Sequence, residues 1–320
     1  MSKLSIVIPV YFNEMNLIDL YDDLELKVLK NLPKYEIIMV DDGSSDDSFK
    51  IMQELSDKDD NIKIYRLSRN FGSHAAILAG IHYATGDCIT SKAADLQEPS
   101  ELIMEMYEKW ERGANVVLAV REDREEPYLQ KMLSNTYYKI MRKFALKNMP
   151  EGGFDCFLID KKVAKVLDNM EESNTSLMGQ ILWCGFRSEV VYYTRRARLK
   201  GKSKWTLSKK IKLSVDSILG FSYLPIRAVT FIGIVTFIGA IIWMIYVLIY
   251  KLTRGISTEG WTTIIIINLF FYGLIMLSLG IIGEYLWRTF DAARNRPVYI
   301  VESENDESEE KHEGNNSSRR

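Results

Sequence analysis

Two long stretches without charged side chains constrain this chain more than any other feature. Residues 228–250 and 262–282 contain no Asp, Glu, Lys or Arg, and each is long enough to cross a bilayer as a helix. Two spans form a hairpin, so the segments before and after it would lie on the same side of the membrane. Residues 1–226 instead mix charged and apolar side chains, as globular domains do. We therefore expect a globular domain attached to a membrane by a helical hairpin.

Positive charges are distributed unevenly around the two spans. The connection between the spans offers only Lys251 and Arg254, whereas Lys and Arg are common in both outer flanks. The positive-inside rule then predicts a multi-pass protein of the cell membrane with both termini and the globular domain in the cytosol. The start of the chain agrees, because Met1 runs almost directly into a strand-like segment rather than a signal peptide. The flanking cations are Arg195, Arg196, Arg198, Lys200, Lys202, Lys204, Lys209, Lys210, Lys212, Arg227, Arg288, Arg294 and Arg296.

The first part of the chain alternates short β-rich runs with helical stretches. Such alternation is typical of an α/β domain with a mostly parallel sheet covered by helices on both faces. We place this domain at residues 1–200. The predicted strands are residues 4–10, 35–40, 62–67, 88–91 and 115–120. The predicted helices are residues 14–30, 46–57, 74–84, 100–112 and 127–147.

The remaining segments have distinct compositions. Residues 201–226 place apolar side chains at helical spacing opposite a lysine-rich face, which predicts an amphipathic helix at the membrane interface. The alternative is a helix packed on the globular domain with a solvated basic face. Residues 227–286 contain the transmembrane hairpin, and residues 287–301 form a juxtamembrane cytosolic segment. Residues 302–320 are acidic and lack apolar periodicity, so a disordered tail is expected.

The strand-like run that ends at Ser91 leads into a cluster of oxygen-bearing side chains. Asp95, Gln97 and Glu98 follow it closely, just before Pro99. Ligands of open α/β sheets bind at the carboxyl ends of the strands. Mg²⁺ commonly takes one or two carboxylates together with the phosphates of its substrate. The sequence therefore indicates a divalent-cation site that serves a phosphate-bearing substrate.

Two other strand ends also carry polar residues. Asp41 and Asp42 precede a Gly-Ser turn and could accept hydrogen bonds from a uracil or ribose. A capped turn without a ligand is an equally weighted alternative, because Asp and Ser favour such turns. Arg69 and Gly72 precede the start of another predicted helix, a setting that suits diphosphate oxygens.

Four segments in this order resemble family 2 glycosyltransferases of the GT-A fold: residues 6–14, 40–44, 69–72 and 94–99. More narrowly, the chain resembles the polyprenyl-phosphate glycosyltransferases related to dolichol-phosphate mannose synthase and the bactoprenol glucosyltransferases. The resemblance covers nearly the whole chain except the tail. It implies an inverting transfer of a hexose to polyprenyl (undecaprenyl) phosphate on the cytosolic face, with UDP-glucose or UDP-N-acetylglucosamine as the expected donor. The product would supply lipid-linked sugar for cell-surface glycans.

The resemblance also assigns roles to residues. Asp95 and Gln97 would hold Mg²⁺ or Mn²⁺, so Asp95 is a catalytic residue together with Asp155, which would lie beside the acceptor. A phosphate monoester carries about −1.5 to −2 charges at pH 7. We therefore expect Asp155 to orient the acceptor rather than to act as an obligatory base. The nucleotide-sugar side comprises Pro9, Tyr11, Asn13, Glu14, Asp41, Asp42, Arg69, Asn70 and Gly72. The lipid phosphate is assigned to Arg198, Lys200, Ser203 and Lys204.

One position departs from the family pattern. The family commonly carries Asp-x-Asp-x-Gln at the metal site, and Ala93 stands at the first of these positions. Asp95 and Gln97 keep the other two, and Glu98 is a candidate substitute ligand. The missing carboxylate supports an alternative, a catalytically silent membrane scaffold with a GT-A fold. A second alternative is a transferase that acts on another lipid or on a glycan.

The expected partners follow from the implied reaction. They are a nucleotide-diphosphate sugar, polyprenyl phosphate and membrane lipid, with a separate flippase and a downstream transferase acting on the product. Self-association into a homo-oligomer is compatible with the sequence. The formal net charge is −2, and no nucleic-acid partner is expected.

Overall fold

One mixed sheet organises the globular domain of this computed structural model, which describes residues 2–122, 128–170, 172, 175–196, 207–254 and 260–304. The strands are β1 Lys3–Val10, β2 Lys34–Asp41, β3 Ile62–Leu67, β4 Cys88–Ser91, β5 Val116–Arg121, β6 Cys156–Asp160, β7 Ser188–Tyr193 and β8 Val301–Glu304. Their order in the sheet is β7-β5-β6-β4-β1-β2-β3-β8. The pairs β1–β2, β2–β3, β1–β4 and β5–β7 are parallel, which confirms the predicted α/β class. Strand β6 runs antiparallel to β4 and β5, and β8 antiparallel to β3.

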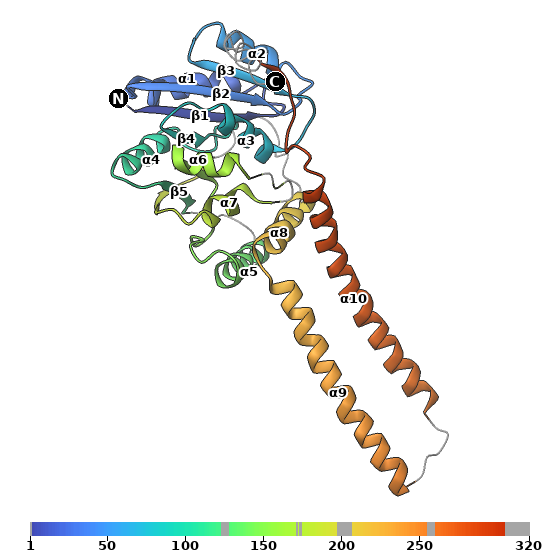
Figure 1. The fold of residues 1–320 in the computed structure, drawn as a ribbon. Helices are drawn as coiled ribbons and strands as arrows, with labels where there is room; N and C mark the ends of the chain where they lie inside the picture. The colour runs from blue at the N-terminus through green and yellow to red at the C-terminus, as the bar shows by residue number, and fades with distance from the viewer. Residues whose placement is uncertain are drawn as a thin grey trace, which may run out of the picture.

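Helices cover both faces of this sheet (Figure 1). They are α1 Leu17–Lys27, α2 Ser48–Ser56, α3 Ser73–Tyr83, α4 Leu102–Glu111, α5 Tyr128–Phe144, α6 Lys161–Asp168, α7 Leu177–Trp183, α8 Leu207–Phe221, α9 Leu224–Arg254 and α10 Trp261–Ala293, with a short 3-10 helix at Leu29–Asn31. Side chains alternate across a strand, so Leu4 and Ile6 of β1 join the core with α1, α2 and α4. Val7 faces the opposite core, which contains α3, α6 and α7.

The order of the strands reverses at β1. The chain runs outward from β1 to β2 and β3, and then returns to place β4 on the other side of β1. Such a reversal is the point at which open α/β sheets bind ligands, at the carboxyl ends of the strands. The loops that follow β1, β2 and β4 meet there, and they contain most of the predicted site residues.

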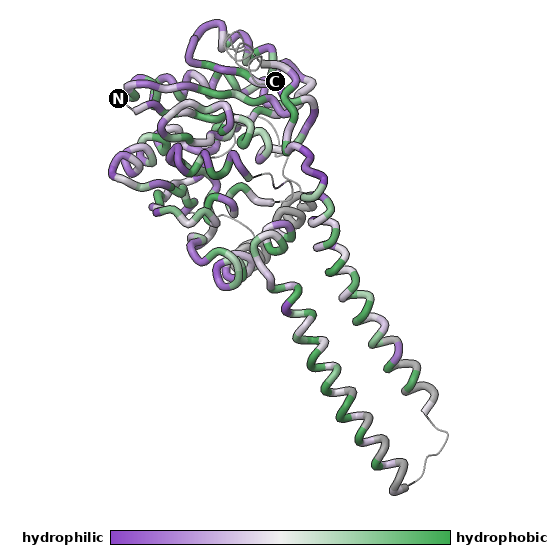
Figure 2. The backbone as a smooth tube through the Cα atoms, in the orientation of Figure 1, coloured by the Kyte–Doolittle hydropathy of each residue, from purple (hydrophilic) through white to green (hydrophobic). Residues whose placement is uncertain are grey.

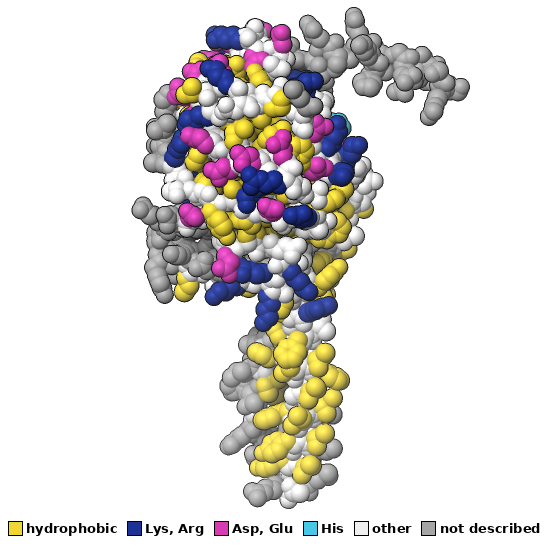
Figure 3. All heavy atoms as spheres, turned by 90° about the vertical axis from the view of Figure 1, so that its left-hand side faces the viewer, with side chains coloured by type: hydrophobic (Ala, Val, Ile, Leu, Met, Phe, Trp, Pro, Cys, Tyr) yellow, Lys and Arg dark blue, Asp and Glu magenta, His cyan; other side chains and the backbone are white. Residues whose placement is uncertain are grey.

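Helices α9 and α10 are long and apolar enough to cross a membrane, judged by length and composition. They project side by side from the domain, and most of their length is hydrophobic (Figure 2). The 31 residues of α9 extend over about 46 Å, which exceeds the roughly 30 Å hydrocarbon core of a bilayer. Both predicted spans fall inside these helices. Lys and Arg side chains gather where the domain meets the helix pair (Figure 3).

Helix α8 connects the domain to this pair. The amphipathic pattern of residues 201–226 predicted a helix on the membrane surface. The alternative was a helix packed on the globular domain. The structure shows such packing at the carboxyl-terminal half of α8, because Ile218 and Phe221 contact the core formed around α3, α6 and α7. The Phe221 ring lies so close to Gly179 of α7 that a Cβ on that glycine would come within 2.3 Å of it.

The structure corrects the predicted disorder of residues 302–320 in part, because residues 302–304 belong to strand β8. Tyr65 and Arg66 of β3 pair with Glu304 and Ser303, and the Ser68 amide donates to the Ile300 carbonyl at 2.9 Å. The unpaired backbone groups at the edge of β3 bind this segment despite its acidic composition, because strand pairing uses the main chain. Residues 305–320 lie outside the described part of the chain.

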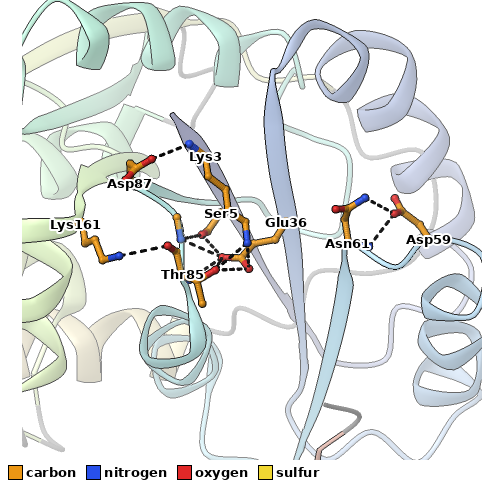
Figure 4. Close-up of polar contacts among 9 residues, drawn as sticks. Lys3, Ser5, Glu36, Asp59, Asn61, Thr85, Asp87 and Lys161 are labelled. Atoms are coloured by element: carbon orange, nitrogen blue, oxygen red, sulfur yellow. Dashed lines mark hydrogen bonds and ion pairs between the residues drawn. The ribbon is translucent and has the colours of Figure 1, made fainter. Parts of the chain in front are cut away.

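A buried carboxylate joins β1, β2 and the loop before β4 at the amino ends of these strands (Figure 4). Glu36 is 2% exposed and lies 2.8 Å from the Lys3 ammonium. Its carboxylate also accepts hydrogen bonds from the Ser5 hydroxyl at 2.5 Å and from the Thr85 amide at 2.7 Å. The Gly86 amide donates to the same carboxylate at 3.1 Å. Glu36 therefore fastens three segments at the edge of the sheet opposite the carboxyl ends of these strands.

Candidate active site

The loops that follow β1 and β2 are held together by side chain to backbone hydrogen bonds. The Phe12 amide donates to the Ser44 hydroxyl at 3.0 Å, and the Asn13 amide donates to the Ser48 hydroxyl at 2.9 Å. The Glu14 carboxylate accepts from the Asp47 amide at 3.0 Å. The structure thus brings the predicted segment at residues 9–14 against the turn that follows β2.

Asp41 lies at the end of β2 and is fully buried. Its carboxylate accepts from the Ser44 amide at 3.1 Å and lies 3.3 Å from Nε of Arg66. Burial raises the pKa of Asp41, although these contacts oppose the shift. The carboxylate is used to close the turn, which fits the capped-turn alternative. Contact between Asp41 and a nucleotide stays a prediction.

Asp42 fastens a second loop to the same place. Its carboxylate accepts from the Phe71 amide at 2.7 Å and from the Gly72 amide at 2.9 Å. Gly43 has a φ of +73°, and a Cβ there would lie 2.8 Å from the backbone carbon of Arg69. Only a glycine allows this close approach of the two loops. The two predicted nucleotide motifs are therefore one structural unit.

The second of these motifs presents a cation beside a helix N-terminus. Arg69 is exposed, and its guanidinium lies 4.1 Å from the centre of the Phe71 ring. Asn70 and Gly72 lie in the loop that leads into the N-terminus of α3. Amide groups at a helix N-terminus attract anions, and a nearby arginine adds to that attraction. This arrangement is chemically suited to phosphate oxygens.

The loop after β4 brings Asp95 and Gln97 together. The Asp95 carboxylate accepts from the Gln97 amide at 3.2 Å, and the intervening Leu96 has a φ of +56°. Both side chains face one nitrogen of Arg195: Nη2 lies 2.6 Å from Oε1 of Gln97 and 3.9 Å from Oδ2 of Asp95. Carboxylate and amide oxygens are the type of ligand that a hard divalent cation prefers. No group of three His, Cys, Asp or Glu side chains in the described ranges is placed to hold a metal. The donor's phosphates would have to supply further ligands.

Glu98, the candidate substitute for the carboxylate missing at Ala93, is buried. It accepts from the Ala93 amide at 3.4 Å, and the buried Lys92 ammonium donates to its backbone carbonyl. Burial raises the pKa of Glu98 to about 7, against the attraction of Lys92. Its carboxylate supports the loop after β4 from the interior of the domain. Metal binding by Glu98 stays a prediction.

Asp155 is exposed in the loop that leads into β6. Its carboxylate accepts a hydrogen bond from the Tyr193 hydroxyl at 3.2 Å. Burial and the neighbouring Asp155 raise the pKa of Tyr193, so the phenol keeps the proton that it donates. Tyr193 ends β7, and Arg195 follows it by two residues. One strand end therefore connects the predicted acceptor residue with the predicted metal ligands.

The sequence predictions missed Tyr193, Arg195 and Lys92 as site residues. Residues 189–193 are a β-rich run followed by two arginines, the kind of signal that marked the other strand ends. The four residues assigned to the lipid phosphate, Arg198, Lys200, Ser203 and Lys204, lie outside the described residues.

An apolar groove of about 530 Å³ opens where α8, α9 and α10 meet. It is lined by Val215, Ile218, Leu219, Pro225, Met276, Leu277, Gly280, Ile281 and Glu284. Next to Glu284, Arg288 lies 2.6 Å from Asp216 of α8 and 3.1 Å from Glu284 itself. These contacts fix α8 against α10 at the end of the groove that Glu284 lines.

Comparisons with known proteins identify relatives over most of the chain. The family described as Glycosyl transferase family 2 matches residues 5–168. An uncharacterized glycosyltransferase YkcC of Bacillus subtilis (strain 168) is 39% identical, with 93% of each chain covered. A prophage bactoprenol glucosyl transferase homolog of Escherichia coli (strain K12) is 33% identical over 93% of this chain and 98% of its own. A bactoprenol glucosyl transferase of Shigella phage SfV is 31% identical over 94% and 99%.

Proposed function

The chain belongs to glycosyltransferase family 2, and on that premise we propose that it moves a hexose from a nucleotide-diphosphate sugar to polyprenyl phosphate at a membrane. Two of its relatives bear the name bactoprenol glucosyl transferase, which supports a polyprenyl phosphate acceptor. The fold is GT-A, and the chain is an enzyme of the transferase class. UDP-glucose and UDP-N-acetylglucosamine are the donors proposed here.

The donor would lie at the carboxyl ends of β1, β2 and β4. Arg69 and the N-terminus of α3 are suited to its phosphates, and the segment at residues 9–14 borders the nucleotide. Asp95 and Gln97 would hold Mg²⁺ or Mn²⁺ there. The bound ion would neutralise charge that grows on the departing diphosphate. The metal assignment is supported by the two oxygens that face Nη2 of Arg195.

The acceptor would approach from the side of Asp155. An oxygen of the lipid phosphate would attack the anomeric carbon, and the bond to the diphosphate oxygen would break with its electron pair, with inversion at that carbon. The phosphate is largely deprotonated at pH 7, so Asp155 would orient it rather than take its proton. The Tyr193 hydroxyl holds Asp155 in place. Arg198, Lys200, Ser203 and Lys204 are proposed to bind the lipid phosphate.

One observation carries the proposal more than any other. The strand end that contacts Asp155 through Tyr193 also contacts Asp95 and Gln97 through Arg195. The proposed donor-binding pair and the proposed acceptor residue are thus linked through one strand end, in a chain that also has two apolar helices and an apolar groove at their base. This combination suits a transferase that uses a lipid acceptor.

The proposal is tested by incubating the detergent-solubilised protein with undecaprenyl phosphate and a panel of radiolabelled sugar nucleotides. We expect one UDP-sugar to label the lipid fraction, and labelling to stop when a chelator removes divalent cations. Reactions without undecaprenyl phosphate are the control. Label that enters only another lipid or a glycan would overturn the acceptor. Absence of both transfer and metal-dependent donor hydrolysis would favour the scaffold alternative.

The proposed membrane topology has its own test. With both apolar helices crossing the bilayer, a reporter fused to the end of the chain should lie in the cytosol with the N-terminus. A reporter inserted between α9 and α10 should lie outside. The terminal reporter is placed beyond β8, so that the pairing between β8 and β3 is preserved. Termini on opposite sides would remove the cytosolic-donor mechanism.

A further inference from the structure

Arg195 occupies the place that the cation is expected to take. Its Nη2 atom donates a hydrogen bond to Oε1 of Gln97 at 2.6 Å and lies 3.9 Å from Oδ2 of Asp95. A hydrogen bond between a charged donor and an amide oxygen is short and comparatively strong. The oxygens that would ligate a metal are therefore directed at a guanidinium that belongs to the chain.

Backbone contacts hold Arg195 in this position. The amide of the next residue, Arg196, donates to the Gln97 carbonyl at 2.8 Å. The Gln97 side-chain amide donates back to the Arg196 carbonyl at 3.4 Å. On the other side, the Tyr193 hydroxyl is bonded to Asp155. The segment that carries Arg195 is thus anchored on both sides of the residue.

A guanidinium in this position competes with a divalent cation for these two oxygens. The Asp95 carboxylate supplies one negative charge, which the guanidinium already balances. Because Ala93 supplies no second carboxylate, a cation of charge +2 that enters beside Arg195 would be repelled. Binding of the metal requires the guanidinium to move away from Oε1 of Gln97.

We propose that Arg195 is a built-in competitor for the divalent cation of the Asp95–Gln97 site, so that Mg²⁺ or Mn²⁺ binds only by displacing its guanidinium. The inference rests on the proposed function, because it takes Asp95 and Gln97 as the metal ligands. This competition lowers the affinity of the site for a metal ion that binds without a nucleotide. The negative charges of a nucleotide diphosphate make displacement favourable, which couples the binding of the metal to that of the donor.

The test measures binding of Mn²⁺ alone, without a nucleotide. Free Mn²⁺ is followed by electron paramagnetic resonance during titration of the full-length protein in detergent. Arg195→Gln removes the guanidinium and leaves the oxygens of Asp95 and Gln97 in place. We expect the apparent Kd for Mn²⁺ to fall by roughly three- to tenfold, the range that loss of one partly exposed charged hydrogen bond allows.

Arg196→Gln is the matched control. It removes the same charge one residue away, and its guanidinium contacts Glu101 at 3.2 Å rather than the metal ligands. The backbone bonds between residues 196 and 97 remain in both variants. The affinity for Mn²⁺ should stay close to that of the wild type in Arg196→Gln. Adding Asp95→Asn to Arg195→Gln should abolish the gain, which assigns the gain to this site.

Several results would overturn the inference. They are equal Mn²⁺ affinity in the wild type and Arg195→Gln, weaker affinity in Arg195→Gln, an equal gain in Arg196→Gln, or no Mn²⁺ binding by any of these proteins. Sugar transfer is assayed separately. Transfer with unchanged Mn²⁺ affinity would remove only the competitor role. A gain in affinity without transfer to polyprenyl phosphate would remove only the proposed function.

Discussion

Replacing Asp95 by Asn should lower the metal-dependent transfer rate by about a hundredfold or more at limiting Mn²⁺. Asp95 is the one carboxylate of the proposed ligand pair, and a divalent ion contributes several kcal/mol of transition-state stabilisation. Each ~1.4 kcal/mol corresponds to a factor of ten in rate. The folding cost should be small, because Asn keeps an oxygen that can accept the 3.2 Å bond from the Gln97 amide. Initial rates over a series of Mn²⁺ concentrations check the prediction.

Two neighbouring substitutions sharpen this test. Ala93→Asp restores the family's first carboxylate and should be tolerated, with tighter binding of the metal. Glu98→Gln distinguishes two roles of Glu98, that of a metal ligand and that of a buried residue that supports the loop. A raised metal requirement in this variant would indicate a ligand. An unchanged requirement would assign Glu98 to its contacts with Ala93 and Lys92. If Asp95→Asn keeps wild-type turnover at limiting metal, the proposed metal site is wrong.

Glu36→Ala is expected to destabilise the domain by about 1–3 kcal/mol, the cost of leaving a buried hydrogen-bond donor without its acceptor. The substitution leaves the Thr85 and Gly86 amides without their acceptor and removes the partner of Lys3. Urea unfolding in detergent, followed by tryptophan fluorescence, measures the loss. Glu54→Ala, at an exposed position of α2, is the control and should cost less than about 0.5 kcal/mol. Equal losses in the two variants would contradict the role given to Glu36.

The Glu36 contribution should also depend on pH. Burial alone would raise the pKa of Glu36, but hydrogen bonds from Lys3, Ser5 and Thr85 together hold it below its ordinary value. A lowered folded-state pKa stabilises the fold at pH values above the unfolded-state pKa. That stability is lost as the pH falls through the folded-state pKa. The difference in unfolding free energy between the wild type and Glu36→Gln should therefore shrink in acid, below the usual glutamate range.

Local sequence signals were strong enough to predict the first part of the fold. Strands β3 and β4 begin and end at the predicted residues, because each is a short run rich in β-forming residues and bounded by polar turns. Strands β6, β7 and β8 were missed. Residues 188–193 end in four β-forming residues, but four of the six side chains are exposed or half-buried, so the run shows no clear alternation of apolar and polar residues. Strand β8 is acidic, and its pairing with β3 depends on a sheet edge far away in sequence.

The site residues could be predicted from the sequence where they directly follow a strand. Asp95 and Gln97 belong to one loop, and the structure brings them together. The internal use of Asp41 and Asp42 was only one of two alternatives, because a carboxylate that closes a turn looks the same in sequence as one that binds a nucleotide. Arg195 could not be matched to Gln97, since their contact joins residues 98 positions apart. That contact exists only because β7 pairs with β5.

The chain leaves the sheet before α8 and returns to it at β8, so the long helices are an insertion within the sheet rather than an appendage. A soluble fragment cut after residue 200 would discard the strand that covers β3. The exposed N–H and C=O groups of β3 would then pair with other chains and promote aggregation. It would also lose Val298 and Tyr299, which pack on the core around α3. A useful soluble form must therefore keep residues 298–304 and replace only the helices between.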